Sequence, residues 1–346
     1  MTIQKTKFDQ PDGFQFGQFK NERGYDVRYG HMKSTSSDAS NGTLVLGPGY
    51  GEPIEKYFEL INDLTAAGYD IWIMDWVGQG GSSRHDPSDP QRSYDLENFV
   101  EHHRDDLYHL TTQIMSPPKD HKIGYMGFSL GAHIGFRFMS QYPYIFDMAA
   151  MNAALMDVKT KNRFHRSIIP SMTKSLRLRG CQNEYIPGGG DWSEDKHDFT
   201  KNKKTHDERR FRVLKDVFNS NAGLQVGDVR VNWVHHLLPS IHKLNRKMYL
   251  EDIRAPVFLS IAGDDQTVSV KAQRRAAKHL FNAHSAEYLN ARHELWMEAD
   301  RIRSPWLKNM LNQISGVMKS DIPPVRISRR VSKICSNSPP ERWFLR

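Results

Sequence analysis

Short apolar runs that alternate with amphipathic stretches constrain the fold of this chain more than any other feature. Runs long enough for one buried strand occupy residues 43–47, 70–75, 123–128, 148–151, 256–263 and 286–289. Helical spacing of apolar residues is found at residues 53–68, 96–115, 130–142, 270–280 and 299–314. Strands that alternate with helices along a chain usually form a parallel sheet with helices on both faces. The sequence therefore predicts an α/β fold with a mostly parallel central sheet flanked by helices.

Charge divides the chain into segments. The net charge is +8 over 346 residues, but residues 157–248 alone carry 19 Lys and Arg against 10 Asp and Glu. That segment is polar and interrupts the alternation, so we expect a basic cap (lid) inserted between two parts of the core, residues 1–156 and 249–318. Residues 319–346 carry 7 basic against 2 acidic residues, with Pro pairs and little periodicity. We expect this tail to be largely disordered.

Composition also limits the location and the partners. Two cysteines make no disulfide framework, the first thirty residues hold no apolar run of signal-peptide length, and no run approaches the ~20 apolar residues of a spanning helix. These observations predict a cytoplasmic protein, and the basic charge leaves open a peripheral contact with the inner face of an anionic membrane. No nucleic-acid-binding module is recognisable, so nucleic acid is not an expected partner.

The pentapeptide Gly127-Phe128-Ser129-Leu130-Gly131 joins a predicted strand to a predicted helix. This is the context of a nucleophile elbow, a turn so tight that the residues two before and two after the serine must be glycine. The turn lifts the serine hydroxyl above the sheet, and the helix behind it offers backbone N–H groups to a developing oxyanion. Ser129 is therefore the predicted nucleophile, with Gly127 and Gly131 as the elbow glycines.

A serine nucleophile needs a histidine base and a carboxylate that orients the base, and in this arrangement they follow in the order Ser, acid, His. Asp264 and Asp265 follow the strand predicted at 256–263, and His293 follows the next strand. We choose Asp265 over Asp264, because Asp265-Gln266-Thr267-Val268 fits the D-x-x-V pattern of such acid loops. The predicted triad is Ser129, Asp265 and His293.

An oxyanion hole takes a second N–H from the loop after the first strand of the core. Here that loop is LGPGYGEPIEKY, which starts at residue 46 and has glycines at 47, 49 and 51. Glycines allow the backbone to approach a reacting carbonyl closely. The predicted donors are the backbone N–H groups of Tyr50 and Leu130.

Five blocks carry a family resemblance: LGPGYGEPIEKYFEL, MDWVGQGGSSR, GFSLG, GDDQTV and ARHELWMEAD. In this order they resemble the signature blocks of the α/β-hydrolases that include lysophospholipases and monoacylglycerol lipases, nearest to the bacterial lysophospholipases. The resemblance implies an α/β-hydrolase fold and the triad and oxyanion donors named above. It implies hydrolysis of carboxylic esters of single-chain lipids, lysophospholipid or monoacylglycerol, through an acyl-enzyme, with no metal and no cofactor. Pro48 and the pair Trp76-Val77 depart from the family pattern, which leaves open how their loops are braced.

The first part of the cap mixes basic and apolar residues. Arg163, Arg166, Arg177 and Arg179 are interleaved with residues such as Phe164, Ile168 and Met172. Such a segment could lie on an anionic lipid surface or hold a phosphate beside an acyl groove. It could equally be a solvated helix with one stripe facing the core.

Three other functions remain open at this point. A prolyl-aminopeptidase-like peptidase or a general carboxylesterase would use the same core. A catalytically silent α/β-hydrolase that only binds a ligand is the alternative outside enzymes, although an intact Ser, Asp and His in the proper order argue against it.

Overall fold

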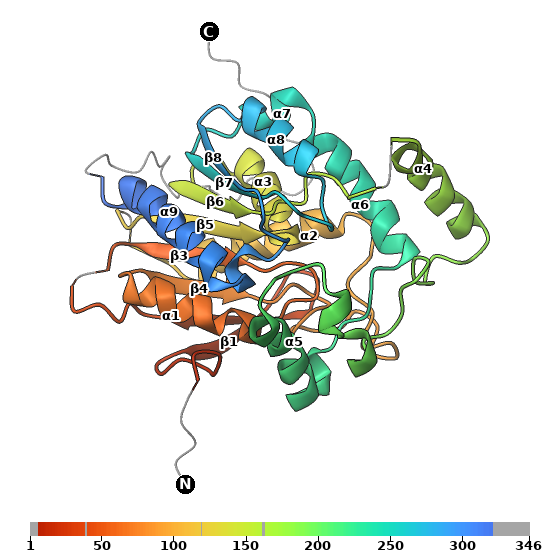
Figure 1. Ribbon diagram of the computed structural model, residues 1–346, viewed down its shortest axis with the longest axis horizontal. Helices are drawn as coiled ribbons and strands as arrows, with labels where there is room; N and C mark the ends of the chain where they lie inside the picture. Colours follow the sequence, from red (N-terminus) through yellow and green to blue (C-terminus); the bar gives the residue numbers. More distant parts are fainter. Residues whose placement is uncertain (1–5, 39, 119, 161–162, 321–346) are drawn as a thin grey trace.

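The computed structural model describes residues 6–38, 40–118, 120–160 and 163–320 (Figure 1). Within these residues one sheet of eight strands has the order β1-β2-β4-β3-β5-β6-β7-β8. The strands of its parallel part are β3 (Thr43–Gly47), β4 (Asp70–Met74), β5 (Ile123–Phe128), β6 (Met148–Asn152), β7 (Val257–Ala262) and β8 (Ala283–Tyr288). Every residue of β3, β5, β6 and β7 is buried. Strands covered on both faces read as continuous apolar runs, which is why these strands could be predicted.

An antiparallel hairpin at the N-terminal edge was not predicted from the sequence. It consists of β1 (Gln15–Lys20) and β2 (Asp26–Met32), and β2 pairs antiparallel with β4. In β1 only Phe19 is buried, so the hairpin has no continuous apolar run. The mixed sheet is therefore parallel over six strands and antiparallel at this edge.

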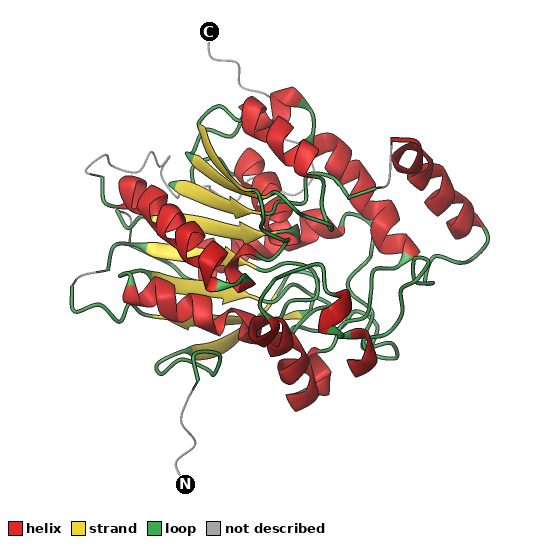
Figure 2. Cartoon of the chain, in the orientation of Figure 1, coloured by secondary structure: helices red, strands yellow, loops and turns green. Residues whose placement is uncertain are grey.

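Helices cover both faces of the sheet, as the colours of Figure 2 show. On one face α1 (Phe58–Ala66) and α9 (Asp300–Met318) contribute to one cluster of buried apolar side chains. On the other face α2 (Phe99–His109), α3 (Leu130–Gln141) and α8 (Val270–His279) contribute to a second cluster. The predicted helix at 96–115 begins three residues later, at Phe99, and ends in a π-helical turn, Leu110–Ile114. These two layers and the sheet give the α/β-hydrolase fold.

Between β6 and β7 the chain builds a helical layer beyond the carboxyl ends of the parallel strands (Figure 1). Its helices are α4 (Arg163–Leu178), α5 (Glu208–Ser220) and α6 (Val231–Leu244). The short α7 (Lys247–Glu251) follows α6 and packs against α3 and α8 instead (Figure 1). We keep the division of the chain into core, cap and tail as a proposal, with the cap at residues 157–248. Of the proposed tail, residues 321–346 lie outside the described part. No helix in the described part is long and apolar enough to cross a membrane.

His133 joins the core to this cap layer. Its ring is fully buried on α3, with Nδ1 2.8 Å from the carbonyl oxygen of Leu155 and Nε2 2.8 Å from the hydroxyl of Ser240 on α6. A carbonyl oxygen can only accept, so Nδ1 carries the proton and Nε2 accepts from the serine. Burial lowers the pKa of His133 to about 4, so the ring is neutral near pH 7.

The low pKa of His133 makes stability depend on pH. The unfolded chain binds a proton near the ordinary value of 6.5, whereas the folded chain binds it only near 4. Stability is therefore complete above the unfolded value and falls as the pH drops toward the folded one. We expect the wild type to lose about 3 kcal/mol more unfolding free energy over this range than a His133→Gln variant. Urea unfolding of both proteins along a pH series measures the difference, and parallel pH profiles would contradict it.

Candidate active site

Ser129 lies at the junction of β5 and α3 in a backbone conformation that side chains rarely adopt, with φ 50° and ψ −109°. A non-glycine residue at positive φ stores strain that the surrounding structure must hold. Three backbone hydrogen bonds hold it: Ser129 N–H donates to Asn152 (3.0 Å), and its carbonyl accepts from His133 (3.1 Å) and Leu155 (3.1 Å). The strained turn predicted from the pentapeptide is therefore present.

Steric overlap with neighbouring backbone atoms explains why both elbow positions are glycine. A Cβ on Gly131 would overlap the carbonyl of Gly47 on the neighbouring strand. A Cβ on Gly127 would lie 2.6 Å from the Cα of Ala132, a distance that real Cβ atoms do not show. Backbone atoms cannot move aside as a flexible side chain can. Neither position therefore tolerates alanine without a shift of the elbow.

His293 and Asp265 form a buried pair on the loops after β8 and β7. His293 Nδ1 lies 2.7 Å from Asp265 Oδ2. The other carboxylate oxygen, Oδ1, accepts the N–H groups of Thr267 (2.7 Å) and Val268 (2.9 Å). Asp264 is exposed instead and bonds to Gln266. The structure thus brings Asp265, and not Asp264, to the histidine.

Ser129 shares the carboxyl edge of the parallel strands with this pair. Its side chain and that of His293 are both nearly buried, at 8% and 4% exposure. Among the hydrogen bonds of the described residues, none joins Ser129 Oγ to His293 Nε2. The hydrogen bond between Asp265 and His293 is present in this structure, whereas the contact between Ser129 and His293 belongs to the proposal below.

The two backbone groups predicted as oxyanion donors have no acceptor among the described residues. Around Tyr50, the N–H of Gly49 donates to Glu52 (2.8 Å) and the N–H of Gly51 donates to Gln79 (2.5 Å). No hydrogen bond from the N–H of Tyr50 or of Leu130 is found in this part of the chain. Leu130 is the first residue of α3, where N–H groups lack intrahelical partners and the helix dipole favours an anion.

The loop after β4 braces this oxyanion loop. Trp76 is buried, and its Nε1–H donates to the carbonyl of Pro48 at 2.9 Å. Gln79 accepts from Gly51, as given above, and Asp75 accepts the N–H of Ile54 at 3.0 Å. Trp76, which departs from the family pattern, thus reaches Pro48 directly.

A buried lysine connects the oxyanion loop to the histidine loop. Lys56 Nζ lies 2.8 Å from Glu52 Oε1 and 2.8 Å from Glu294 Oε1. Glu52 in turn accepts from Gly49 N–H and from the hydroxyl of Tyr57 (2.5 Å). Burial alone would lower the pKa of Lys56, but the two carboxylates raise it, so the ammonium stays charged. Sequence reasoning missed this network, since Glu52 and Lys56 look like an ordinary surface pair at i and i+4.

A cavity of about 560 Å³ lies beside these groups, between the oxyanion loop, the acid loop and the cap. Tyr50 and Gly51 line it on one side and Gln266 and Thr267 on another. The cap contributes apolar and charged residues: Trp192, Phe211, Leu214, Phe218, four lysines (196, 201, 203, 204) and four aspartates (191, 195, 198, 228). Among the described residues no group of His, Cys, Asp and Glu is arranged to hold a metal ion.

The described side chains of the cap arginines have different surroundings. Arg166 is paired with Asp157, Nε to Oδ1, at 2.7 Å. Arg177 lines a second pocket between α4 and α6, and Arg179 is exposed just after α4. Arg163 is the first residue of α4, but its side chain is outside the described part.

Comparison with known proteins identifies the family. A family model described as serine aminopeptidase, S33, matches residues 38–300, well over half of the chain. The chain belongs to this family. It is thus an α/β-hydrolase and a serine ester hydrolase, which confirms the serine hydrolase family predicted from the five sequence blocks.

Two curated relatives of this S33 hydrolase are bacterial. One is the probable lysophospholipase L2 of Haemophilus influenzae, 24% identical over 292 residues, which cover 84% of this chain and 88% of the relative. The other is lysophospholipase L2 of Escherichia coli K12, 26% identical over 287 residues, which cover 80% and 81%. Both alignments extend over most of each protein, so core and cap are compared together.

Two solved structures show that the fold is shared. A soluble variant of monoglyceride lipase from Saccharomyces cerevisiae is similar at a TM-score of 0.67 and 17% identity, covering 91% of this chain and 97% of that one. A carboxyl esterase from Bacillus coagulans is similar at 0.68 and 16%, covering 89% and 100%. The α/β-hydrolase fold predicted from the sequence is confirmed.

The buried lysine of this S33 hydrolase gives a stability prediction. Lys56→Met leaves Glu52 buried without its cation and leaves Glu294 with Lys204 alone, at 3.4 Å. Removing one partner of a buried ion pair typically costs about 3–5 kcal/mol of unfolding free energy. A double variant, Lys56→Met with Glu294→Gln, should lose less than the sum of the two single changes, because it removes one of the stranded charges. Denaturant unfolding measures both.

Lys247→Met is the matched control for this prediction. Lys247 is exposed and pairs with Glu251 at i+4 on the surface, so its loss should change the unfolding free energy by less than about 1 kcal/mol. Equal losses from Lys56→Met and Lys247→Met would contradict the bracing assigned to Lys56.

Proposed function

We propose that this serine hydrolase cleaves the carboxylic ester of a single-chain lipid, with a lysophospholipid as the preferred substrate. The observation that carries the proposal is the buried Asp265–His293 pair at 2.7 Å on the sheet edge that also carries the strained Ser129. Such a pair has no structural need for a serine elbow beside it, whereas an acyl-transfer site needs all three groups.

In the proposed reaction Ser129 Oγ attacks the ester carbonyl while His293 Nε2 takes the hydroxyl proton. Asp265 holds Nδ1–H, which keeps the base in the correct tautomer and stabilises the imidazolium. The N–H groups of Tyr50 and Leu130 bind the oxyanion. The tetrahedral intermediate collapses, His293 gives its proton to the leaving alkoxide, and an acyl-enzyme remains on Ser129. Water then attacks the acyl-enzyme with His293 again as base, which releases the fatty acid and restores the serine.

The cavity under the cap supports a lipid with a charged head group. Its wall combines aromatic and aliphatic side chains, such as Trp192 and Phe218, with charges of both signs, such as Lys203 and Asp195. A monoacylglycerol has no charge for these groups to bind, whereas a lysophospholipid carries a phosphate and often an ammonium group. The names of the two curated relatives, both lysophospholipases, support the same substrate class.

Two features of the sequence prediction remain proposals. A cytoplasmic location is one, and peripheral contact of the cap with an anionic membrane is the other. Of the cap arginines, Arg166 is paired with Asp157, so Arg177 and Arg179 are the better candidates for such a contact.

The first test is a hydrolysis screen with Ser129→Ala as the control. The wild type should release fatty acid from lysophosphatidylethanolamine faster than from monoacylglycerol, and Ser129→Ala should lower turnover by a factor on the order of a thousand or more. The wild type should react with a fluorophosphonate probe at Ser129, and the variant should not. Far-UV circular dichroism and thermal unfolding check that the variant is folded. Cleavage of a prolyl amide without ester cleavage would contradict the proposal in favour of a peptidase.

The second test separates the two neighbouring aspartates. Asp265→Asn removes the carboxylate that fixes the His293 tautomer, so kcat should fall by about 10⁴-fold. Asp264→Asn is matched in chemistry and differs by one position, but its side chain is exposed and should leave kcat within about twofold. Turnover of a soluble short-chain ester measures both variants. The reverse order would assign the acid to Asp264.

A further inference from the structure

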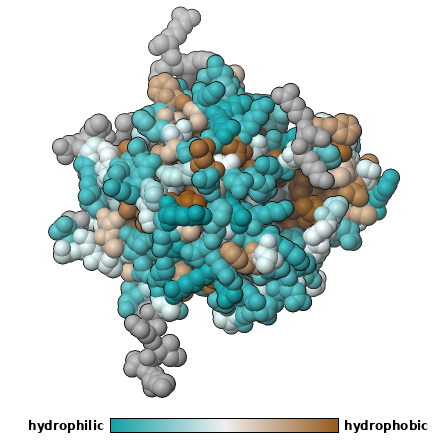
Figure 3. All heavy atoms as spheres, in the orientation of Figure 1, coloured by the Kyte–Doolittle hydropathy of each residue, from teal (hydrophilic) through white to brown (hydrophobic). Residues whose placement is uncertain are grey.

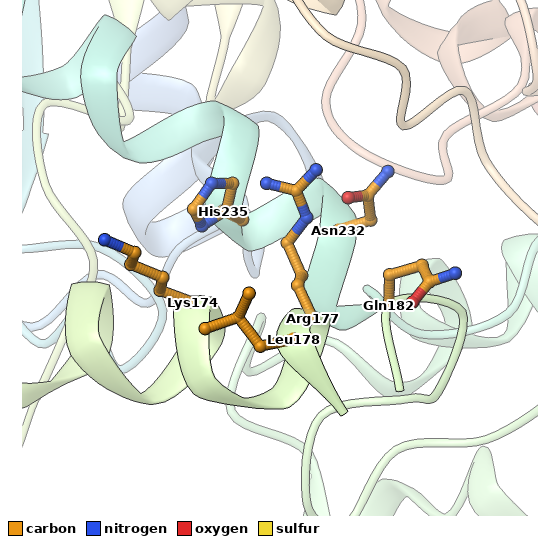
Figure 4. Close-up of a pocket in the computed structure, with 6 residues that line it drawn as sticks. All are labelled: Lys174, Arg177, Leu178, Gln182, Asn232 and His235. Atoms are coloured by element: carbon orange, nitrogen blue, oxygen red, sulfur yellow. The ribbon is translucent and has the colours of Figure 1, made fainter. Parts of the chain in front are cut away.

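A second pocket lies in the cap, between α4 and α6, apart from the cavity lined by Tyr50 and Gln266. Its volume is about 540 Å³, within the range of small-molecule sites. Six residues line it: Lys174, Arg177, Leu178, Gln182, Asn232 and His235. Figure 4 shows the Arg177 side chain rising from α4 toward α6, with its guanidinium between the labelled His235 ring and Asn232 amide. None of these six residues lines the cavity under the cap described above.

The charged residues that line this pocket are both cationic. Lys174 and Arg177 contribute two cations, and no carboxylate is among the lining residues. Within the described residues neither cation is in an ion pair, in contrast to Arg166, Arg210 and Arg230 of the same cap. The carboxylate of Glu97 raises the pKa of His235, but Glu97 is not among the residues that line the pocket. Burial, most strongly, and then Arg177 and Lys174 lower the pKa of His235.

Asn232 adds an acceptor to the pocket wall. Its residue is 8% exposed, and Nδ2 donates to the carbonyl of Asp95 at 2.9 Å. Its Oδ1 is buried and has no hydrogen-bond partner. Buried polar atoms are nearly always hydrogen-bonded in folded proteins, so this oxygen marks an interaction that the chain itself does not complete. In Figure 4 the oxygen points to the side on which Arg177 lies.

The outer face of α4 is apolar beside this pocket. Phe164 is 69% exposed, Ile168 39% and Met172 38%, and their spacing of four residues places them on one helix face. Leu178 lines the pocket and is itself 80% exposed. Figure 3 shows a hollow bounded by apolar side chains on the side of the molecule that carries α4 and α6. Large apolar side chains next to unpaired cations are the composition of an interfacial helix on an anionic bilayer.

We propose that the α4–α6 pocket binds the phosphate head group of an anionic phospholipid while the apolar face of α4 enters the bilayer surface. Arg177 and Lys174 hold the phosphate, since guanidinium and ammonium groups form charge-assisted hydrogen bonds with phosphate oxygens. The Asn232 oxygen is an acceptor for a hydroxyl of the head group. The exposed apolar residues select a lipid in a membrane over a free phosphate, because a soluble anion offers nothing for them to bury.

The proposed site is separate from catalysis but is joined to it through α6. Trp233, next to Asn232, packs edge-to-face on Tyr50 of the oxyanion loop with ring centroids 5.0 Å apart. One face of α6 therefore meets the lipid pocket and the other meets the active-site loop. The proposal does not rest on the proposed reaction: a chain that failed to cleave lysophospholipid could still bind anionic lipid here.

Vesicle co-sedimentation of the full chain tests the site. Two vesicle types are compared, phosphatidylcholine alone and phosphatidylcholine with phosphatidylglycerol, at low and high salt. The wild type should prefer the anionic vesicles. Each cation at such a surface changes partitioning about fivefold, so Lys174→Gln with Arg177→Gln should weaken binding to anionic vesicles about thirtyfold. Turnover of a soluble short-chain ester should stay within twofold of wild type, since neither residue touches the reacting groups, and it also reports that the variant is folded.

Matched variants distinguish lipid binding in this pocket from attraction by the overall positive charge of the protein. Lys271→Gln with Lys278→Gln removes two exposed cations from α8 and should change binding little. Gln182→Glu places a carboxylate in the pocket wall and should weaken binding several-fold more than Gln113→Glu, on an exposed turn outside the pocket. If the lysine control weakens binding as much as the pocket variant, or if both glutamate variants behave alike, the pocket is not the site.

Titration with inorganic phosphate distinguishes a lipid head group from a free phosphate ion as the ligand of the pocket. Calorimetric titration of the free protein with phosphate alone should give no tight binding, because the apolar face contributes nothing there. Tight phosphate binding without any preference for anionic vesicles would overturn the lipid proposal. Equal binding to both vesicle types, independent of salt, would overturn it as well.

Discussion

The buried ammonium of Lys56 is the constraint on which the arrangement of the active site depends. It lies between two carboxylates, Glu52 on the oxyanion loop and Glu294 beside His293, and all three are almost completely buried. A charge in such a place is expensive unless it is paired, and once paired it fixes the distance between the segments that carry it. The loop that carries Tyr50 and the loop that carries His293 therefore occupy fixed positions relative to each other. Glu52 extends the link to the backbone itself, because it also accepts the N–H of Gly49.

The local parts of the site could be predicted from the sequence, whereas the links between them could not. Ser129 was found because the elbow requires glycine at two fixed positions, Asp265 because it follows the buried strand β7, and His293 because it follows the last strand, β8. Strands β5 and β7 are legible as apolar runs, whereas β8 has no fully buried residue. Lys56 and Glu294 are 238 residues apart, and no periodicity marks such a pair. The β1–β2 hairpin was missed for a related reason, since a strand with one buried residue in six looks like a loop.

The cap shows that net charge alone says little about where a surface binds. Much of its excess of basic residues is used inside the protein: Arg210 bonds to Glu59, Asp207 and Asp300, and Arg230 pairs with Asp89. Arg166, one of the four arginines chosen from the sequence, is paired in the same way. Position in the fold separates the paired cations from the unpaired ones, and Lys174 and Arg177 are distinguished by facing a pocket without a carboxylate.

The spread of the site along the chain has a consequence for biosynthesis. The loop that carries Tyr50 comes first, followed by Ser129, Asp265 and His293, from residue 47 to residue 293, and each of the first three follows a strand that pairs with one made later. The ammonium of Lys56 cannot pair with Glu294 until residue 294 has left the ribosome. The strands on either side of Lys56, β3 and β4, are among the first to emerge. Nascent chains usually fold domain by domain from the N-terminus. For this protein that order means a core that can begin to collapse early and a candidate site that is completed last, so a chain synthesised only as far as β7 carries Ser129 without His293.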